Sequence, residues 1–292
     1  MSPVINKAID PKRPSLSKST VTSAAYCARR AWYADKRRLP DGARKSFAMP
    51  ERVIFGVAVD QMTAEIVAAR RDGVRITDKD LILSAANEGL REAGQRWCSE
   101  EIDWARFGAE LYSATESWLA AIDSGVMPVD ENTTLQGVEG ESLKFGEGPD
   151  AALGTPDFIV QWPDGRPGIV DVKAAFRRKG PVDFVNAEVS YYAWLYSSIT
   201  GEIPRFTYAS WVRTKNPEWQ VLTEDLTPAH VALGAEYVST TRALLAASRA
   251  EDVTFDSASC RSCEWAKPVP DVKHAGCSVG MAVIASYERG NA

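Results

Sequence analysis

The sequence predicts an α/β fold in which helices flank a mixed β-sheet, with a helical insertion. Two observations predict this class. Helical patterns fill most of the first half of the chain, and β-rich segments separated by Gly and Pro turns follow Pro128. With 25% charged and 45% hydrophobic residues, the composition is that of an ordinary globular protein. Disorder is therefore excluded as the dominant state.

The helices are expected at residues 20–36, 51–71, 78–97, 101–123, 182–199 and 228–249. Ser and Thr residues open the first of these helices, and Gly73 and Gly125 close two others, because glycine accepts the left-handed conformation that ends a helix. Pro228 suits the first turn of the last helix. The helix at 182–199 is expected between two strands.

The strands are expected at residues 133–143, 158–162, 169–173 and 206–213, with a further edge strand at 219–222. No internal repeat divides the chain, so we expect one domain over residues 1–292. Its parts are a basic N-terminal segment (1–50), a helical region (51–127), an α/β core (128–225) and a C-terminal helix with a cysteine-rich end (226–292).

Charge is distributed unevenly. The net charge is −5, but residues 12–45 carry +8 and the remainder carries −13. A basic segment on an acidic body suits a polyanion such as a nucleic acid, although a solvated arm is an equally good interpretation. No apolar run is long enough for a membrane span or a secretory signal, so a cytoplasmic protein without a membrane partner is expected.

The most informative stretch is a hairpin that carries two carboxylates and a lysine. Residues 163–166 (Pro-Asp-Gly-Arg) form a strong turn signal. A turn centred near Asp164 sets Asp157 opposite Asp171, with Cβ atoms roughly 5 Å apart. Strand periodicity places Lys173 on the same face as Asp171. Ordinary surface acids on a hairpin are the alternative.

Two close carboxylates repel each other unless a cation lies between them. Oxygen ligands with open positions suit Mg²⁺ or Mn²⁺, which can hold a phosphate and activate a bound water. A neighbouring lysine can orient the attacking water or neutralise developing charge. Asp157 and Asp171 are thus candidate metal ligands, and Lys173 is a candidate catalytic residue.

The motif Pro156-Asp157 followed by Asp171-Val172-Lys173 resembles the signature of the PD-(D/E)XK nuclease superfamily. The resemblance implies a restriction-endonuclease-like core and hydrolysis of phosphodiester bonds with a divalent metal. It also implies that the carbonyl of Val172 is a metal ligand.

Neighbouring segments are similar to the RecB-like branch of that superfamily. Gly56 to Asp60 matches its Gly-x-x-x-His motif with Asp in place of the metal-binding His, so the resemblance implies Asp60 as a ligand. A helix-surface acid is the alternative for Asp60, and Glu65 is a weaker substitute. Glu188 to Tyr192 matches Gln-x-x-x-Tyr with Glu in place of Gln. This match implies that Glu188 supports the catalytic site and that Tyr192 helps to place DNA.

The cysteines resemble those of iron–sulfur members of this branch, which are similar to the AddB nuclease domain and the CRISPR-associated RecB-like exonucleases. One Cys precedes basic and aromatic residues near the N-terminus, and three follow the core: Cys27, Cys260, Cys263 and Cys277. The resemblance implies a [4Fe–4S] cluster that joins the two ends of the chain. A structural zinc site made by Cys260, Cys263, His274 and Cys277 is the alternative. Cys98 is expected to be a buried thiol.

The sequence therefore indicates a metal-dependent DNA exonuclease that acts on single strands or DNA ends in recombination, repair or spacer processing, with a recombination or CRISPR protein as a possible partner. The arginines expected along the DNA backbone are Arg29, Arg30, Arg177 and Arg178, although a solvated loop is an equally good interpretation of the last two. Two alternatives stay open. One is a DNA-binding or assembly module that kept the fold without turnover. The other is an endonuclease of restriction or repair type.

Overall fold

The computed structural model describes residues 16–34, 50–74, 79–95, 101–135, 142–247 and 253. The helices are α1 (Lys18–Tyr26), α2 (Ala28–Ala34), α3 (Glu51–Arg71), α4 (Lys79–Gly94), α5 (Trp104–Asp123), α6 (Ala187–Thr200) and α7 (Pro228–Leu245). The strands are β1 (Leu16–Ser17), β2 (Thr134–Leu135), β3 (Leu143–Phe145), β4 (Ala152–Gly154), β5 (Phe158–Gln161), β6 (Pro167–Ala175), β7 (Arg205–Val212) and β8 (Glu218–Asp225).

The main sheet has five strands in the order β2-β5-β6-β7-β8. Strands β6 and β7 are parallel, and the other neighbours are antiparallel. The crossover between the parallel strands contains α6, as a parallel connection requires. The predicted mixed α/β architecture is therefore confirmed.

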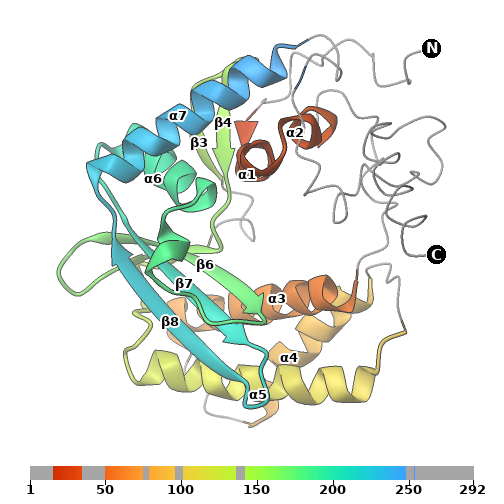
Figure 1. The fold of residues 1–292 in the computed structure, drawn as a ribbon. Helices are drawn as coiled ribbons and strands as arrows, with labels where there is room; N and C mark the ends of the chain where they lie inside the picture. Colours follow the sequence, from red (N-terminus) through yellow and green to blue (C-terminus); the bar gives the residue numbers. More distant parts are fainter. Residues whose placement is uncertain are drawn as a thin grey trace, which may run out of the picture.

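The helices cover the two faces of the main sheet unequally. Helices α3, α4 and α5 pack on one face, while α6 and α7 lie on the other (Figure 1). Alternate residues of β6 serve the two layers: Val170 and Val172 join the core under α3–α5, and Ile169 joins the core under α6. This alternation directs Asp171, two residues after Ile169, toward the α6 side.

A second sheet of three short strands, in the order β1-β4-β3, lies beside α6 and α7. Strand β1 pairs in parallel with β4, with Leu16 opposite Ala152. Leu16 and Val21 are fully buried in a cluster with Tyr191 and other residues of α6 and α7. This packing holds the beginning of α1 against α6.

The structure differs from the sequence-based elements at several points. The helix expected at 20–36 is divided at Cys27, whose backbone is extended between α1 and α2. The strand expected at 133–143 is replaced by β2 and β3, which belong to different sheets. The helix expected from residue 182 begins at Ala187, because the side chain of Asn186 caps it.

Several expectations lie outside the described residues, namely those on Cys98, Cys260, Cys263, His274 and Cys277. The division of the chain into one domain with four parts stays a prediction. Among the helices described, none combines the length and the apolar character that a membrane crossing needs.

Candidate active site

The hairpin of β5 and β6 has the predicted register. Phe158 pairs with Val170 and Ile159 with Ile169, which continues to Asp157 opposite Asp171. Its turn contains Gly165 at a φ of 85°, a conformation that favours glycine. Asp157 lies just before β5, and its Oδ2 atom accepts a hydrogen bond of 2.5 Å from the backbone N–H of Val172. Its carboxylate therefore lies against the segment that carries Asp171 and Lys173.

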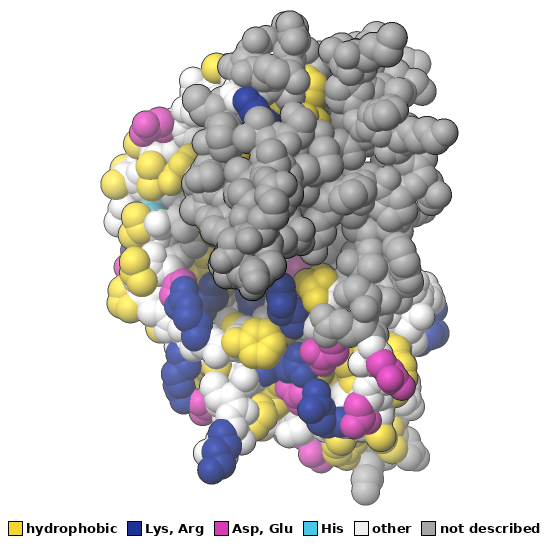
Figure 2. All heavy atoms as spheres, turned by 45° about the vertical axis from the view of Figure 1, so that its right-hand side comes forward, with side chains coloured by type: hydrophobic (Ala, Val, Ile, Leu, Met, Phe, Trp, Pro, Cys, Tyr) yellow, Lys and Arg dark blue, Asp and Glu magenta, His cyan; other side chains and the backbone are white. Residues whose placement is uncertain are grey.

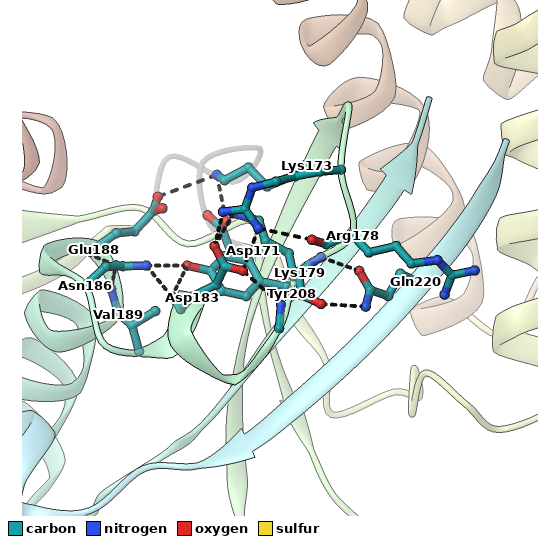
Figure 3. A network of polar contacts seen from close by, with 12 residues as sticks. Asp171, Lys173, Arg178, Lys179, Asp183, Asn186, Glu188, Val189, Tyr208 and Gln220 are labelled. Carbon is teal, nitrogen blue, oxygen red and sulfur yellow. Dashed lines mark hydrogen bonds and ion pairs between the residues drawn. The ribbon is translucent and has the colours of Figure 1, made fainter. Parts of the chain in front are cut away.

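Two lysines and two carboxylates meet beside this hairpin. The Nζ atom of Lys173 lies 2.6 Å from Asp171 Oδ2 and 3.5 Å from Glu188 Oε1. The Nζ atom of Lys18 lies 2.7 Å from Glu188 Oε1 and 3.5 Å from Asp171 Oδ1. Figure 3 shows Glu188 of α6 near the β6 residues Asp171 and Lys173. The site thus draws on β6, α6 and α1.

A polar network fixes the beginning of α6, where Glu188 lies. Asn186 Oδ1 accepts hydrogen bonds from the N–H groups of Glu188 and Val189, at 2.8 and 3.0 Å. Asn186 also donates to the Tyr208 hydroxyl at 3.0 Å and to the backbone carbonyl of Asp183 (Figure 3). A carboxylate in the first helical turn is also favoured by the helix dipole. Glu188 is therefore held at a defined position.

Asp183 anchors this network to the loop after β6. Its carboxylate accepts two hydrogen bonds from the Arg177 guanidinium, at 2.6 and 2.9 Å, and one from the N–H of Gly180. The hydrogen bonds from Arg177 lower the pKa of Asp183 to about 2. The carboxylate is thus ionised throughout the neutral range, and the loop stays attached to the segment before α6.

The pKa values of the carboxylates differ between the part of the site near Asp157 and the part near Glu188. Burial and the charge of Asp171 raise the pKa of Asp157 to about 6. Burial and the charge of Glu188 raise the pKa of Asp171. Burial also favours a higher pKa for Glu188, but Lys173 and Lys18 outweigh it and lower that pKa to about 2. The lysines therefore compensate the Glu188 side more fully than the Asp157 side.

Asp60 of α3 belongs to the less compensated side. Its side chain reaches solvent, yet surrounding protein atoms reduce its hydration. This desolvation, followed by the negative charge of Asp157, raises its pKa well above the ordinary value. The aspartate expected in place of the usual His therefore lies within the electrostatic influence of Asp157 and Asp171.

The residues present fit a hard divalent cation that keeps water ligands. No group of three or more His, Cys, Asp or Glu side chains forms a ready-made metal cage in the described part of the chain. However, within the described ranges the buried Asp171 Oδ2 has Lys173 as its one ion-pair partner and accepts no other hydrogen bond. Among the same residues, the buried hydroxyl of Tyr192 has no hydrogen-bond partner. Buried oxygen atoms with open valences, next to acids that repel each other, suit Mg²⁺ or Mn²⁺.

The structure also locates the residues expected to contact DNA. Tyr192 is fully buried, with Lys18 Nζ 5.7 Å from its ring centre. Arg29 is buried and donates two hydrogen bonds to the carbonyl of Val253. Arg177 pairs with Asp183, and Arg178 with Glu218, although both arginines are more than half exposed. DNA contacts by these residues and by Arg30, and metal binding by the Val172 carbonyl, stay predictions.

Sequence reasoning missed Lys18, Asp183 and Asn186. Lys18 was counted only as part of the basic segment, and no local pattern indicates that this segment packs on α6. Asn186 is two residues before Glu188, and its cap could have been recognised, because Asn is among the preferred residues at that position. Asp183 follows Pro181 in a short 3₁₀ turn that resembled the start of the helix.

Cys27 is buried at the junction of α1 and α2. The neighbouring helix α2 contacts two described residues beyond α7. Trp32 donates a hydrogen bond to the carbonyl of Ala247 at 2.9 Å, and Arg29 donates to the carbonyl of Val253. Ala247 and Val253 therefore lie beside the helix that follows Cys27.

Comparison with protein families gave a match over most of the chain. A family model described as the PD-(D/E)XK nuclease superfamily matches residues 15–267. No curated protein matches the sequence.

Two solved structures show a distant likeness. A protein of Eubacterium rectale provisionally named an exonuclease has 12% identity and a TM-score of 0.49, over 89% of this chain and 90% of its own. A protein called SSO0001 has 14% identity and a TM-score of 0.29, over 66% of this chain and 96% of its own. Neither likeness is close enough to bear on function.

Proposed function

The chain belongs to the PD-(D/E)XK nuclease superfamily, and from this premise we propose that it hydrolyses phosphodiester bonds in DNA with Mg²⁺ or Mn²⁺. The observation that carries the proposal is the hairpin register. It sets Asp157 opposite Asp171 and brings the carboxylate of Asp157 to the N–H of Val172, next to Lys173.

Each residue of the site has a role in the proposal. Asp60, Asp157 and Asp171 hold the cation, with the Val172 carbonyl as a further ligand. When bound, the cation supplies Lewis-acid stabilisation of the phosphate and lowers the pKa of a water molecule. The ammonium of Lys173, fixed 2.6 Å from Asp171, orients the attacking water and offsets charge on the phosphate.

Glu188 supports the site from α6. It contacts the ammonium groups of both Lys173 and Lys18, so it fixes where these positive charges lie relative to Asp171. The residue occupies the place of the Gln in the RecB-like motif, and Asp60 occupies the place of the His. We therefore assign the chain to that branch, in which an exonuclease serving recombination, repair or spacer processing is expected.

Single strands or DNA ends are the proposed substrates. Phe176 follows β6 directly and is 61% exposed, with Arg177 and Arg178 after it. On the face drawn in Figure 2, Lys and Arg side chains surround exposed hydrophobic ones. An exposed ring among cations is a combination that binds unpaired bases and their phosphates.

The proposal includes a [4Fe–4S] cluster held by four cysteines: Cys27, Cys260, Cys263 and Cys277. The alternative is a zinc ion held by Cys260, Cys263, His274 and Cys277. Its support is the contact of α2 with Ala247 and Val253. Anaerobic purification discriminates between the two: absorbance near 400 nm indicates the cluster, and colourless protein with zinc indicates the other metal.

The function is tested on labelled linear single-stranded, linear double-stranded and closed circular DNA, with Mg²⁺, Mn²⁺ or EDTA. We expect metal-dependent degradation of linear DNA that Asp171→Ala abolishes, with circles left intact. Cleavage of circles identifies an endonuclease. Binding without cleavage in either metal identifies a module that lacks turnover and contradicts the proposal.

A further inference from the structure

Lys18 is a second lysine of the active site, and neither the family motif nor the sequence pattern assigns it a role. It is the first residue of α1, far from the hairpin in sequence. Its Nζ atom nevertheless contacts Glu188 at 2.7 Å and Asp171 at 3.5 Å, the same two carboxylates that Lys173 contacts. The two lysines thus flank one pair of acids.

The fold holds Lys18 in place from both sides. The preceding residues pair with β4, with Ser17 opposite Leu153. The Ser17 side chain caps α1 by accepting a hydrogen bond from the N–H of Thr20 at 3.3 Å. After Lys18, the fully buried Val21 packs into the cluster that contains residues of α6. The position of Lys18 is therefore fixed by strand pairing, by the cap of α1 and by the buried Val21.

The distribution of charge indicates what this position does. Four carboxylates (Asp60, Asp157, Asp171 and Glu188) share the site with two ammonium groups. Both ammonium groups lie against Asp171 and Glu188. Over the residues that the structure describes, no Lys or Arg nitrogen forms an ion pair with Asp60 or Asp157. Among these described residues the formal excess is two negative charges, located toward Asp60 and Asp157, and one divalent cation balances it.

We propose that Lys18 takes the place of a second metal ion and limits the nuclease site to one divalent cation. In two-metal sites, a second ion lies about 3.5–4 Å from the first and shares a bridging carboxylate with it. Here the ammonium of Lys18 already lies against Glu188 and the Oδ1 atom of Asp171, so its positive charge repels a second divalent ion there. Lys18 is a positioning residue, and the inference rests on the proposed function only in assuming that the site binds metal.

The consequence concerns the number of ions that bind. Removing the ammonium while keeping an apolar side chain of similar length, as in Lys18→Met, leaves Glu188 with Lys173 as its remaining cation in the described site. Among the described residues the formal excess then becomes three negative charges, and residue 18 no longer repels a cation beside Glu188. A second divalent ion is expected to enter there, next to the first.

The test is Mn²⁺ binding to the full-length protein, measured by titration calorimetry and by electron paramagnetic resonance. Ions that still bind to the Asp171→Asn variant are subtracted, so that only ions bound at the active site are counted. We expect one ion per wild-type chain, with the hyperfine pattern of an isolated Mn²⁺. Lys18→Met should bind two, with the broadened signal of a spin-coupled pair. Lys18→Arg, which keeps the charge, should bind one.

Lys144→Met is the matched control, because Lys144 is an exposed lysine on β3, and it should bind one ion. Circular dichroism shows whether each variant is folded. If Lys18→Met does not fold, the number of ions that the wild type binds still tests the inference. Two coupled ions in the wild type, or one ion in folded Lys18→Met, overturns the inference. Absence of any Asp171-dependent ion in the wild type instead refutes the proposed metal site itself, so the two failures are distinguishable.

Discussion

Replacing Asp157 by Asn should stabilise the metal-free protein while it abolishes nuclease activity. Burial and the charge of Asp171 raise the pKa of Asp157 from 3.8 to about 6. Keeping such a carboxylate ionised costs the folded state about 3 kcal/mol above that pH, because the unfolded chain ionises it freely. The amide of Asn has nearly the same shape and can still accept the hydrogen bond from Val172, but it carries no charge.

The sign of the effect depends on pH in a defined way. The pKa is raised in the folded state, so the wild type loses stability as the pH rises from about 4 through 6, while Asp157→Asn does not lose this contribution. The difference in the free energy of unfolding should therefore be near zero at pH 4 and reach about 2–3 kcal/mol in favour of the variant at pH 8.

Urea denaturation in EDTA at pH 4 and pH 8 measures this difference. Glu224→Gln, which changes an exposed acid on β8, is the control and should have little effect at either pH. Adding Mg²⁺ should stabilise the wild type and not Asp157→Asn. If the variant is no more stable than the wild type at pH 8 without metal, the carboxylate is already compensated and the reasoning is wrong.

Three further predictions follow from the same contacts. Glu188→Gln should destabilise the metal-free protein by about 1–3 kcal/mol at neutral pH, because the pKa of Glu188 is lowered to about 2 in the folded state. This loss of stability should vanish as the pH falls toward 2, and urea denaturation measures it. Gly234→Ala should lower the free energy of unfolding by about 1–3 kcal/mol, since its Cβ would lie 2.0 Å from the Ser190 carbonyl oxygen where α7 crosses α6. The control Gly56→Ala, whose Cβ would have nothing within 4 Å, should not destabilise the protein, and thermal or urea unfolding measures both variants. Lys173→Met should lower the single-turnover cleavage rate by roughly 10²-fold or more while DNA affinity measured by fluorescence anisotropy changes little; an unchanged rate would remove this lysine from the mechanism.

The hairpin at the centre of the site could be predicted from the sequence because its signals are local. The turn at residues 163–166 and the alternation on either side fix the register, so the positions of Asp157 and Asp171 follow from counting residues. The long helices and the positions of the main strands along the chain could be predicted for the same reason. The periodicity of each helix or strand, and the glycines that end two of the helices, can be recognised from residues that are close together in the sequence.

The position of Lys18 could not be predicted, because it depends on pairing between distant segments. Strand β1 has two residues and pairs with β4 in parallel, and such a short parallel pair leaves no alternation to recognise. The division of the first helix at Cys27 has the same origin: α1 follows the cluster on α6, while Arg29 and Trp32 of α2 bond to the chain beyond α7. Tertiary packing decides both features.

Anomalous diffraction from crystals soaked in Mn²⁺ tests the central claim most directly. The account predicts a peak within coordination distance, about 2.0–2.6 Å, of carboxylate oxygens of both Asp157 and Asp171, with Asp60 on the same ion. The account is contradicted if no Mn²⁺ ion lies between the two hairpin aspartates. It is also contradicted if Mn²⁺ binds fully at another site while the carboxylates of Asp157 and Asp171 point away from each other.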